Sequence, residues 1–316
     1  MIAPIDVSVP DIQTIVKLRG ELRCDEAMSK HTSWRVGGTA DQFYRPADID
    51  DLGCFLARTN NNEAIVWIGL GSNLLVRDGG IRGVVIQTSG LLGEMHVQTN
   101  DTVRVEAGVA CAKVARFCAK NGFSGAEFLV GIPGTMGGAL AMNAGAFGGE
   151  TWPLVVAVET MGRDGQRHLR IPSEYSIAYR HVDGPKDEWF IAAHLSMQKG
   201  DSDIGLKKIK QFLAQRTDTQ PTGQSSSGSV FRNPPGDFAG RLIEACGLKA
   251  YRIGDVCVSE KHANFFINQG AATANDIEAL IHHVAEVVEK KFAVRLVAEV
   301  HVIGDAEIDN QAAQDD

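Results

Sequence analysis

The chain has 316 residues and a mass of 34.0 kDa, and 44% of its residues are hydrophobic while 22% are charged. This balance is typical of a globular protein and excludes wholesale disorder. The 31 Lys and Arg residues against 39 Asp and Glu residues give a formal net charge of −8, which argues against nucleic acid as a partner. A chain of this length favours two or three subdomains over a single core.

Cysteine and histidine patterns give no sign of a metal site. The six cysteines form no CxxC pair and the nine histidines no HExxH motif, so we expect reduced cysteines and no bound metal. The longest apolar stretches are far shorter than the ~20 residues that a membrane helix needs. The first residues, MIAPIDVSVPDIQTI, lack the basic and apolar regions of a signal peptide. These features predict a cytoplasmic protein without a membrane partner.

The first half of the chain predicts short strands and one clear helix. Residues 1–20 have weak periodicity, compatible with a short helix. Apolar runs bounded by turn residues predict strands at 64–69, 84–87 and 103–107. Residues 111–120 carry apolar side chains at helical spacing and end at Asn121-Gly122, a helix stop. The order indicates α+β alternation, with local strand pairing favoured over a β-α-β array.

The second half adds strands, a helix and a polar segment. Strands are predicted at 154–161, 166–171 and 189–197, and a helix at 205–216. Residues 217–236 are polar and rich in turn residues, which is typical of a flexible linker. The apolar residues within 230–233 (VFRN) interrupt this segment, although a pure linker would not need them.

The last part predicts a small α+β domain. Its expected helices are 239–247 and 276–290, and its expected strands are 255–258, 264–268 and 296–303. Thr273 can cap the last helix, which has one continuous apolar stripe. The tail from Asp305 to Asp316 is acidic and polar, so we expect it to be disordered.

Glycine is the most unusual feature of the composition. The 34 glycines are about 11% of the chain, against about 7% in average proteins. Residues 67–75 (WIGLGSNLL) begin like a dinucleotide fingerprint, but a strand and turn follow instead of the required helix. A tight strand–loop–strand turn and a ligand loop both remain open there. In residues 131–149, small residues with almost no charge predict an anion-binding backbone nest, and close packing is the alternative.

Seven short motifs follow one another along the chain. They are TSWRVGG (32–38), GLGSNLLVRDGG (69–80), GAEFLVGIPGTMGGALAMNAGAFGGE (125–150), AYR (178–180), GSVFRNP (228–234), SEKHANFFIN (259–268) and LVAEVHVIG (296–304). In this order they resemble the bacterial UDP-N-acetylenolpyruvoylglucosamine reductase (MurB) family, the last motif with changes. The resemblance covers nearly the whole chain, from about Cys24 to Gly304.

The resemblance implies an α+β fold of the vanillyl-alcohol-oxidase (PCMH) type. FAD would lie between two N-terminal subdomains, and a C-terminal α+β domain would cover the substrate. The expected units are an extension at 1–20, FAD-binding subdomains at 21–92 and 93–200, a substrate-binding domain at 201–304 and a tail at 305–316. The short stretch between Arg180 and Trp189 resembles the family subtype that lacks an extra tyrosine-bearing loop.

The resemblance also implies a reaction. Members of the family reduce the enolpyruvyl ether of UDP-N-acetylglucosamine to UDP-N-acetylmuramate for peptidoglycan synthesis. FAD would be bound noncovalently, NADPH would supply the hydride, and a UDP-sugar would be the small-molecule partner. The sequence shows no obvious second interface, so we expect a monomer.

Residues carried over from the family fall into three sets. Those expected along FAD are Arg35, Gly37, Gly69, Gly71, Ser72, Asn73, Gly134, Thr135, Gly138, Asn143, Ala144 and Gly145. Those expected to hold the substrate diphosphate or uridine are Asn233, Lys249 and Lys261. The residues that resemble the catalytic set are Arg180, Ser229 and Glu299. His262 and Asn264 are expected to order the domain interface or the flavin surroundings.

The chemistry gives each catalytic residue type a reason. Hydride addition to the vinyl carbon leaves negative charge on the neighbouring carbon and its carboxylate, which the planar guanidinium of Arg180 suits. Ser229 would protonate the carbanionic carbon. Glu299, unusual in an apolar strand because burying a carboxylate is costly, would orient the carboxylate or a water in protonated form. Without the family, Arg180 and Ser229 also fit an ordinary surface arginine and a loop serine.

Departures from the family pattern and other functions stay open. His31 stands where the family often has Asn, Val297-Ala298 replaces a Glu-Pro pair, and His301 replaces a frequent Arg. These changes bear on substrate or NADPH affinity. One alternative function is a flavin oxidase of the same fold, and another is a noncatalytic UDP-sugar-binding relative. Both would be expected to lose the set Arg180, Ser229 and Glu299.

Overall fold

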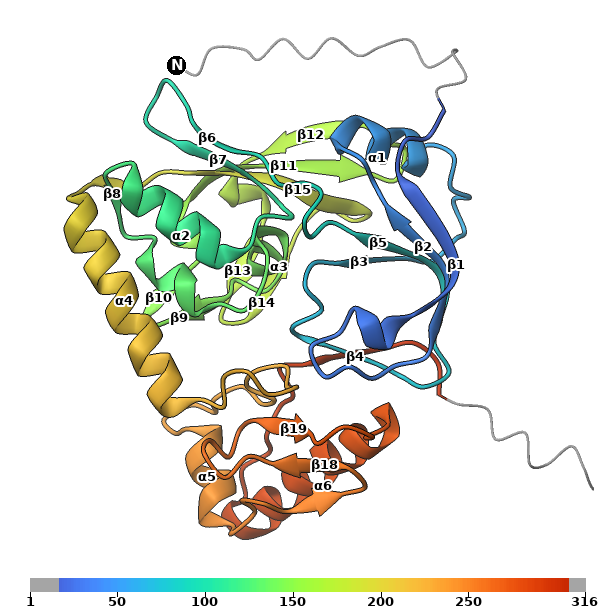
Figure 1. The fold of residues 1–316 in the computed structure, drawn as a ribbon, viewed down its shortest axis with the longest axis vertical. Coiled ribbons are helices and arrows are strands. Elements are labelled where there is room, and N and C mark those ends of the chain that lie inside the picture. Colours follow the sequence, from blue (N-terminus) through green and yellow to red (C-terminus); the bar gives the residue numbers. More distant parts are fainter. Residues whose placement is uncertain (1–16, 307–316) are drawn as a thin grey trace, which may run out of the picture.

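A computed structural model describes residues 17–306, which form three packed units (Figure 1). Two units built on β-sheets lie side by side, and a small α+β unit, drawn in orange and red, lies beneath them. The elements that connect these units position the site described below.

Four strands form the sheet of the first unit. In sheet order they are β1 (Glu21–Ala27), β2 (Thr39–Arg45), β5 (Ile81–Gln87) and β3 (Ile65–Ile68). A short 3-10 turn, η1 (Met28–Lys30), follows β1, and helix α1 (Ile49–Leu56) connects β2 to β3. The Asp48 carboxylate caps α1 by accepting from the Asp51 amide. β5 runs parallel to β2 and β3, so the preference for local pairing was wrong here.

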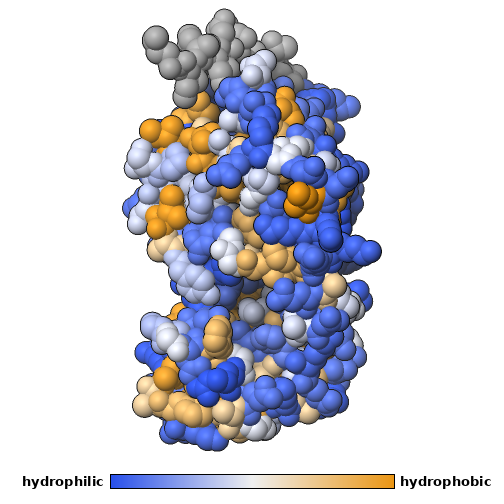
Figure 2. All heavy atoms as spheres, turned by 90° about the vertical axis from the view of Figure 1, so that its left-hand side faces the viewer, coloured by the Kyte–Doolittle hydropathy of each residue, from blue (hydrophilic) through white to orange (hydrophobic). Residues whose placement is uncertain are grey.

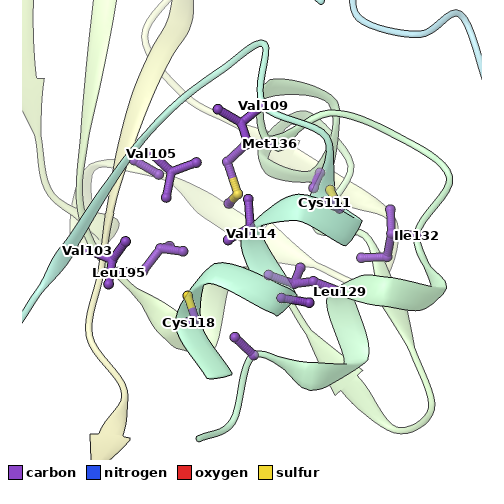
Figure 3. Close-up of a cluster of buried hydrophobic side chains, with 14 of the residues drawn as sticks. Val103, Val105, Val109, Cys111, Val114, Cys118, Leu129, Ile132, Met136 and Leu195 are labelled. Carbon is purple, nitrogen blue, oxygen red and sulfur yellow. The ribbon is translucent and has the colours of Figure 1, made fainter. Parts of the chain in front are cut away.

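Five antiparallel strands form the sheet of the second unit. In sheet order they are β12 (Arg167–Arg170), β11 (Val155–Gly162), β15 (Glu188–Leu195), β7 (Val103–Glu106) and β6 (Met95–Val97). One face is covered by α2 (Cys111–Lys120), η2 (Glu127–Gly131) and α3 (Met136–Ala141). Figure 3 shows Val103 and Leu195 of the sheet facing Val114 and Cys118 of α2. Burying each such aliphatic side chain contributes about 1.5–3 kcal/mol.

Short elements decorate the second unit. The small strand pairs are β8 (Phe123–Ser124) with β16 (Gln198–Lys199), β9 (Gly145–Ala146) with β10 (Gly149–Glu150), and β13 (Ser176–Ala178) with β14 (His181–Asp183). Two further 3-10 turns are η3 (Trp152–Leu154) and η4 (Pro172–Glu174). Because Ala178 pairs with His181, Tyr179 and Arg180 form the two-residue turn of the β13–β14 hairpin.

The C-terminal unit packs two helices on a three-stranded sheet. Its elements are α5 (Ala239–Ala245), β17 (Arg252–Ile253), β18 (Val256–Val258), β19 (Phe266–Asn268) and α6 (Ala274–Phe292). A capping box between Thr273 and Asp276 starts α6, and Ala293 ends it in the left-handed region. The helix buries its apolar stripe, including Ile277 and Leu280, in the core of this unit.

Three connections join the C-terminal unit to the others. Trp34 of the first unit is fully buried in the C-terminal core, and its indole donates to the Phe266 carbonyl at 2.8 Å. Helix α4 (Ser202–Thr219) packs against α2 and η2 of the second unit. Strand β20 (His301–Ile303) pairs in parallel with β4 (Leu74–Val76) of the first unit, so the chain crosses back over the boundary.

Most predicted elements are confirmed, with ends shifted by a few residues. This holds for the strands predicted at 64–69, 84–87, 103–107, 154–161, 166–171, 189–197, 255–258 and 264–268, and for the helices at 111–120, 239–247 and 276–290. The segment 131–149, where a backbone nest is predicted, is not one continuous loop, because helix α3 lies inside it.

Other predictions need correction. The helix at 205–216 spans 202–219, and only the last three residues of the strand at 296–303 pair in β20. The sequence missed β1, because most of its residues are exposed at a sheet edge, and α1, because it is short. Residues 1–16 of the expected N-terminal helix and residues 307–316 of the expected acidic tail lie outside the described part of the chain. Residues 17–20 contain no helix. The domain boundaries stay predictions, although α4, assigned to 201–304, packs on the second unit.

Candidate active site

A cavity of about 620 Å³ lies where the three units meet. Its volume is within the range of about 300–1,000 Å³ that is common for ligand pockets. In Figure 2 the surface narrows between the upper part of the molecule and the C-terminal unit. The lining residues fall within the segments 67–74, 131–147, 179–180, 215–220 and 227–233, together with Phe265, Glu299 and His301. Residues predicted from distant motifs therefore share one cavity.

Two loops of small residues form the wall that we call the glycine wall: residues 69–73 and the cavity-lining residues of 131–145, which do not include Asn143. The loops touch, because a Cβ on Gly69 would overlap the Thr135 hydroxyl. Gly71 has φ +60°, a left-handed conformation that favours glycine, and its carbonyl accepts from the Ser33 amide at 3.1 Å. The Rossmann interpretation stays excluded here, since β4 rather than a helix follows this loop.

Hydroxyl groups of the glycine wall suit a diphosphate. Thr135 is 1% exposed, and its hydroxyl has no hydrogen-bond partner among residues 17–306. A Cβ on Gly134 would lie 3.6 Å from the Ser72 hydroxyl, so Ser72 faces the same loop. An orphaned buried hydroxyl beside small residues is the arrangement expected where phosphoryl oxygens bind. The residues present therefore fit the diphosphate of FAD.

Arg180 projects into the cavity from the turn of the β13–β14 hairpin. Its Nε donates to Glu299 Oε1 at 2.9 Å, and its two terminal nitrogens donate to the carbonyls of Asn143, at 3.3 Å, and Gly145, at 3.0 Å. Its guanidinium carbon lies 5.0 Å from the centre of the Tyr179 ring. A guanidinium has five N–H donors, so one donor on each terminal nitrogen remains available for a ligand.

Glu299 faces Arg180 from the segment before β20. Its amide donates to the Val230 carbonyl at 2.8 Å, and its carbonyl accepts from the Asn73 side-chain amide at 3.1 Å. Burial raises the pKa of the Glu299 carboxyl, while the charges of Arg180 and then Arg232 oppose that rise. Asn73, predicted to contact FAD, also fixes this segment in place.

Ser229 lies in a loop that Asn264 and Glu299 hold from two sides. The Val230 amide donates to the Asn264 carbonyl at 2.9 Å, and the Phe231 amide donates to the Asn264 side chain at 3.0 Å. The Ser229 hydroxyl has no hydrogen-bond partner among residues 17–306, and Ser229 lines the cavity. We call Arg180, Ser229 and Glu299 the side-chain wall.

The cavity includes most, but not all, of the predicted site residues. The FAD set lines it at Gly69, Gly71, Ser72, Asn73, Gly134, Thr135, Gly138, Ala144 and Gly145, and the substrate set lines it at Asn233. The other three members of the FAD set do not line the cavity. Arg35 is exposed, Gly37 packs so closely on Val76 that a Cβ would overlap it, and Asn143 is buried. Lys249 pairs with Glu244 at 2.6 Å, and Lys261 donates to the Thr217 carbonyl at 2.5 Å, both outside the lining.

Several lining residues were not found from the sequence. Arg216 and Gln220, near the end of α4, bond each other at 3.2 Å, and burial lowers the pKa of Arg216. No acidic residue stands three or four positions from Arg216, and that pattern could have marked it as an arginine without a helix partner. His301 and Met142 were also missed as lining residues; the His301 Nε2 lies 3.0 Å from the Met142 sulfur.

The described range contains neither a metal-binding cluster nor a membrane-spanning helix. No three His, Cys, Asp or Glu side chains within residues 17–306 come close enough together to hold a metal ion. The helices of that range include none with the length and apolar character needed to cross a membrane. All six cysteines are free thiols.

Comparisons with known proteins bear on both halves of the chain. The model for the "FAD binding domain" matches residues 40–169, and the model for the "UDP-N-acetylenolpyruvoylglucosamine reductase, C-terminal domain" matches residues 220–303. The UDP-N-acetylenolpyruvoylglucosamine reductase of Legionella pneumophila (strain Corby) is 54% identical over 299 residues, covering 94% of this chain and 97% of the relative. The chain belongs to the UDP-N-acetylenolpyruvoylglucosamine reductase family.

Further members agree with this family assignment. The reductase of Nitrosococcus oceani is 57% identical over 288 residues, covering 91% of this chain and 97% of the relative. The crystal structure of UDP-N-acetylenolpyruvylglucosamine reductase (MurB) from Thermus caldophilus matches with a TM-score of 0.78 and 31% identity, over 90% of this chain and 99% of that one. The predicted fold class and the FAD cofactor are thereby confirmed.

Proposed function

We propose that this chain reduces UDP-N-acetylglucosamine enolpyruvate to UDP-N-acetylmuramate, using NADPH and FAD, in peptidoglycan precursor synthesis. One observation carries the proposal: the hydrogen-bonded pair Arg180–Glu299 and the Ser229 hydroxyl, from three separate segments, face the cavity lined by the glycine wall. A simple binding protein would not need an arginine, an unpartnered hydroxyl and a buried acid at one place.

The glycine wall would hold FAD. Gly69, Gly71, Ser72 and Asn73 would contact its diphosphate or ribityl chain from the first unit, and Gly134, Thr135 and Gly138 from the second. FAD bound there would supply the hydride chemistry that connects NADPH to the vinyl carbon of the substrate. Arg216 would supply positive charge near the diphosphate, because this arginine has no carboxylate partner among residues 17–306.

Arg180 would stabilise the negative charge that develops on the substrate. Its two remaining N–H donors, one on each terminal nitrogen, can bind a carboxylate with both oxygens. The other three donors are already satisfied by fixed acceptors, so the guanidinium does not need to reorganise as charge develops. A prearranged donor of this kind stabilises the transition state more than the ground state.

Ser229 would donate the proton. After hydride addition, the carbon next to the carboxylate is strongly basic, so a hydroxyl is a sufficient acid when it lies in contact with that carbon. The Ser229 hydroxyl has no partner within the described protein, so it is free to face the substrate. Ser229 then carries an alkoxide until a proton returns from solvent.

Glu299 would act as a neutral acid beside Arg180. Burial raises the pKa of the Glu299 carboxyl, which favours the protonated form that can donate a hydrogen bond to the substrate carboxylate or to a water. Asn233 would contact the substrate, because it lines the cavity beyond Ser229. Lys249 and Lys261 keep their proposed roles toward the uridine diphosphate only if the substrate extends past the cavity along α5 or α4.

The test is an assay of the purified protein loaded with FAD. We expect a yellow protein that oxidises NADPH when the enolpyruvyl nucleotide is added and forms the lactyl ether. NADPH oxidation that depends on oxygen and not on the nucleotide would favour a flavin oxidase. A protein that binds UDP-sugars but never reduces them would favour a noncatalytic relative. A colourless protein that cannot be reconstituted with FAD would refute the proposal.

We further propose that the protein acts as a monomer in the cytoplasm. Light scattering of the purified protein is expected to give a single mass near 34.0 kDa, and cell fractionation is expected to recover it in the cytoplasmic fraction. A dimer mass or a membrane-associated pool would contradict these two statements without touching the reaction.

A further inference from the structure

The segment Asn143–Gly145 was expected to face FAD, yet its backbone holds Arg180. The terminal nitrogens of Arg180 donate to the carbonyls of Asn143 and Gly145. A Cβ on Gly145 would lie 3.3 Å from Arg180 Nη1 and would overlap the Gly149 carbonyl. The segment therefore forms a seat for the guanidinium, and a side chain at position 145 would not fit there.

The side chain of Asn143 points away from the cavity, although its backbone belongs to this seat. It is 2% exposed and absent from the cavity lining. Its side-chain nitrogen donates to the Ala178 carbonyl at 3.2 Å and to Glu150 Oε2 at 3.0 Å, and its side-chain oxygen accepts from the Trp152 amide at 3.1 Å. The amide group thus connects the seat to the hairpin that carries Arg180.

The backbone on both sides of this connection is unusual. Arg180 has φ +56° in its two-residue turn, and Asn143 has φ +40°. The left-handed region disfavours a long side chain such as arginine, so the surrounding contacts must hold that turn. Asn143 bonds the carbonyl of Ala178, the residue at which this turn begins.

We infer that Asn143 is a positioning residue for the reaction. Its backbone carbonyl accepts from the Arg180 guanidinium, and its side-chain nitrogen donates to the Ala178 carbonyl, where the turn that carries Arg180 begins. The inference rests on the proposed function of Arg180. It reassigns Asn143 from the FAD wall to the support of the side-chain wall. The two free donors of Arg180 then keep a fixed direction toward the substrate.

The variant Asn143→Gly tests this role cleanly. Glycine keeps the carbonyl and adopts a positive φ without strain, so only the amide group is lost. We expect reoxidation of the reduced flavin by the enolpyruvyl nucleotide to slow by roughly 10- to 100-fold, the usual effect of misplacing a catalytic group. Flavin reduction by NADPH and FAD affinity should not change, because Asn143 does not line the cavity.

A double-mutant cycle separates positioning from a general structural effect. In an Arg180→Lys background the guanidinium is absent, so adding Asn143→Gly should slow flavin reoxidation no further. Thr88→Val is the matched control: Thr88 is buried in the first unit and its hydroxyl donates to the Ile68 carbonyl at 3.2 Å. This control should lower the melting temperature and leave both half-reactions unchanged.

Three outcomes would overturn the inference: normal reoxidation in Asn143→Gly, equal slowing of both half-reactions, or an undiminished effect in the Arg180→Lys background. If Asn143→Gly fails to bind FAD, Glu150→Ala replaces it, since this change removes one acceptor of the same amide and leaves Asn143 intact. A wild-type enzyme whose reduced flavin never reacts with the nucleotide would instead refute the proposed function.

Discussion

The glycine wall and the side-chain wall enclose one cavity but are built differently. The glycine wall, residues 69–73 and the cavity-lining residues of 131–145, presents backbone and hydroxyl groups from two loops that touch each other. The side-chain wall takes Arg180, Ser229 and Glu299 from a hairpin turn, a loop and the segment before β20, and its ion pair joins residues 119 positions apart. This difference matches the proposed function, in which one wall would bind the cofactor and the other would act on the substrate.

Ser229→Ala gives the largest effect that would separate the walls. Loss of the proton donor should slow flavin reoxidation by the enolpyruvyl nucleotide by roughly 10²- to 10⁴-fold. Flavin reduction by NADPH should stay nearly intact, and stopped-flow absorbance of the flavin measures both steps. Ser225→Ala, in the same loop, is the control. Near-normal turnover of Ser229→Ala would remove Ser229 from the acid role.

Arg216→Gln tests whether the glycine wall depends on one charge. Hydrogen bonds to a charged group contribute about 1.5–3 kcal/mol, so FAD affinity should fall by roughly 10- to 100-fold. Titration of the apoprotein with FAD, followed by flavin fluorescence, measures this affinity, and Arg216→Lys should recover part of it. If FAD binds normally while UDP binding by the holoenzyme weakens, Arg216 belongs to the substrate side instead.

Gly69→Ala tests the close contact between the two glycine loops. The new methyl group would overlap the Thr135 hydroxyl, and such overpacking costs typically 1–3 kcal/mol. The apoprotein should melt at a lower temperature and the loaded protein should bind FAD less tightly. For the melting temperature of the apoprotein, Gly138→Ala is the matched control, because a Cβ there lies 3.9 Å from the same hydroxyl. Equal melting temperatures for the two variants would mean that the loops can separate without cost.

The two walls also differ in how far the sequence predicts them. Small residues at Gly69, Gly71 and Gly134 indicate close backbone approach from local composition alone, and all three line the cavity. In the side-chain wall, Arg180 and Ser229 came only from the family resemblance, because neither carries a local signal. Glu299 was unusual on its own, since burying a carboxylate in an apolar strand is costly. Their meeting depends on pairings between segments far apart in the chain, such as the Glu299 amide with the Val230 carbonyl.

Residues that differ from their expected place show the same limit. The family resemblance places Asn143 along FAD, yet its long-range bond to the Ala178 carbonyl decides its position. Arg216 was missed although it lies inside the helix predicted at 205–216, because no local pattern shows that the end of α4 reaches the cavity. Local patterns specify elements, and tertiary contacts select which side chains meet.

The smallest effect, the pH dependence from Glu299, tests whether the side-chain wall works with a neutral acid. Burial raises the pKa of this carboxyl, so its protonated form persists to higher pH than in an exposed glutamate. If the neutral form is active, flavin reoxidation by the nucleotide is constant below that pKa and falls as the pH rises through it. Glu299→Gln is neutral at every pH and should lack this fall.

His301 also titrates beside this site, with its pKa lowered by burial and by Arg232, so His301→Gln must be measured in parallel to remove its contribution. A rate that instead rises with pH through the Glu299 pKa, and is low at every pH in Glu299→Gln, would mean that the carboxylate is the active form. Glu299 would then serve to hold the Arg180 side chain through the 2.9 Å ion pair, and the contrast between the walls would rest on Arg180 and Ser229 alone.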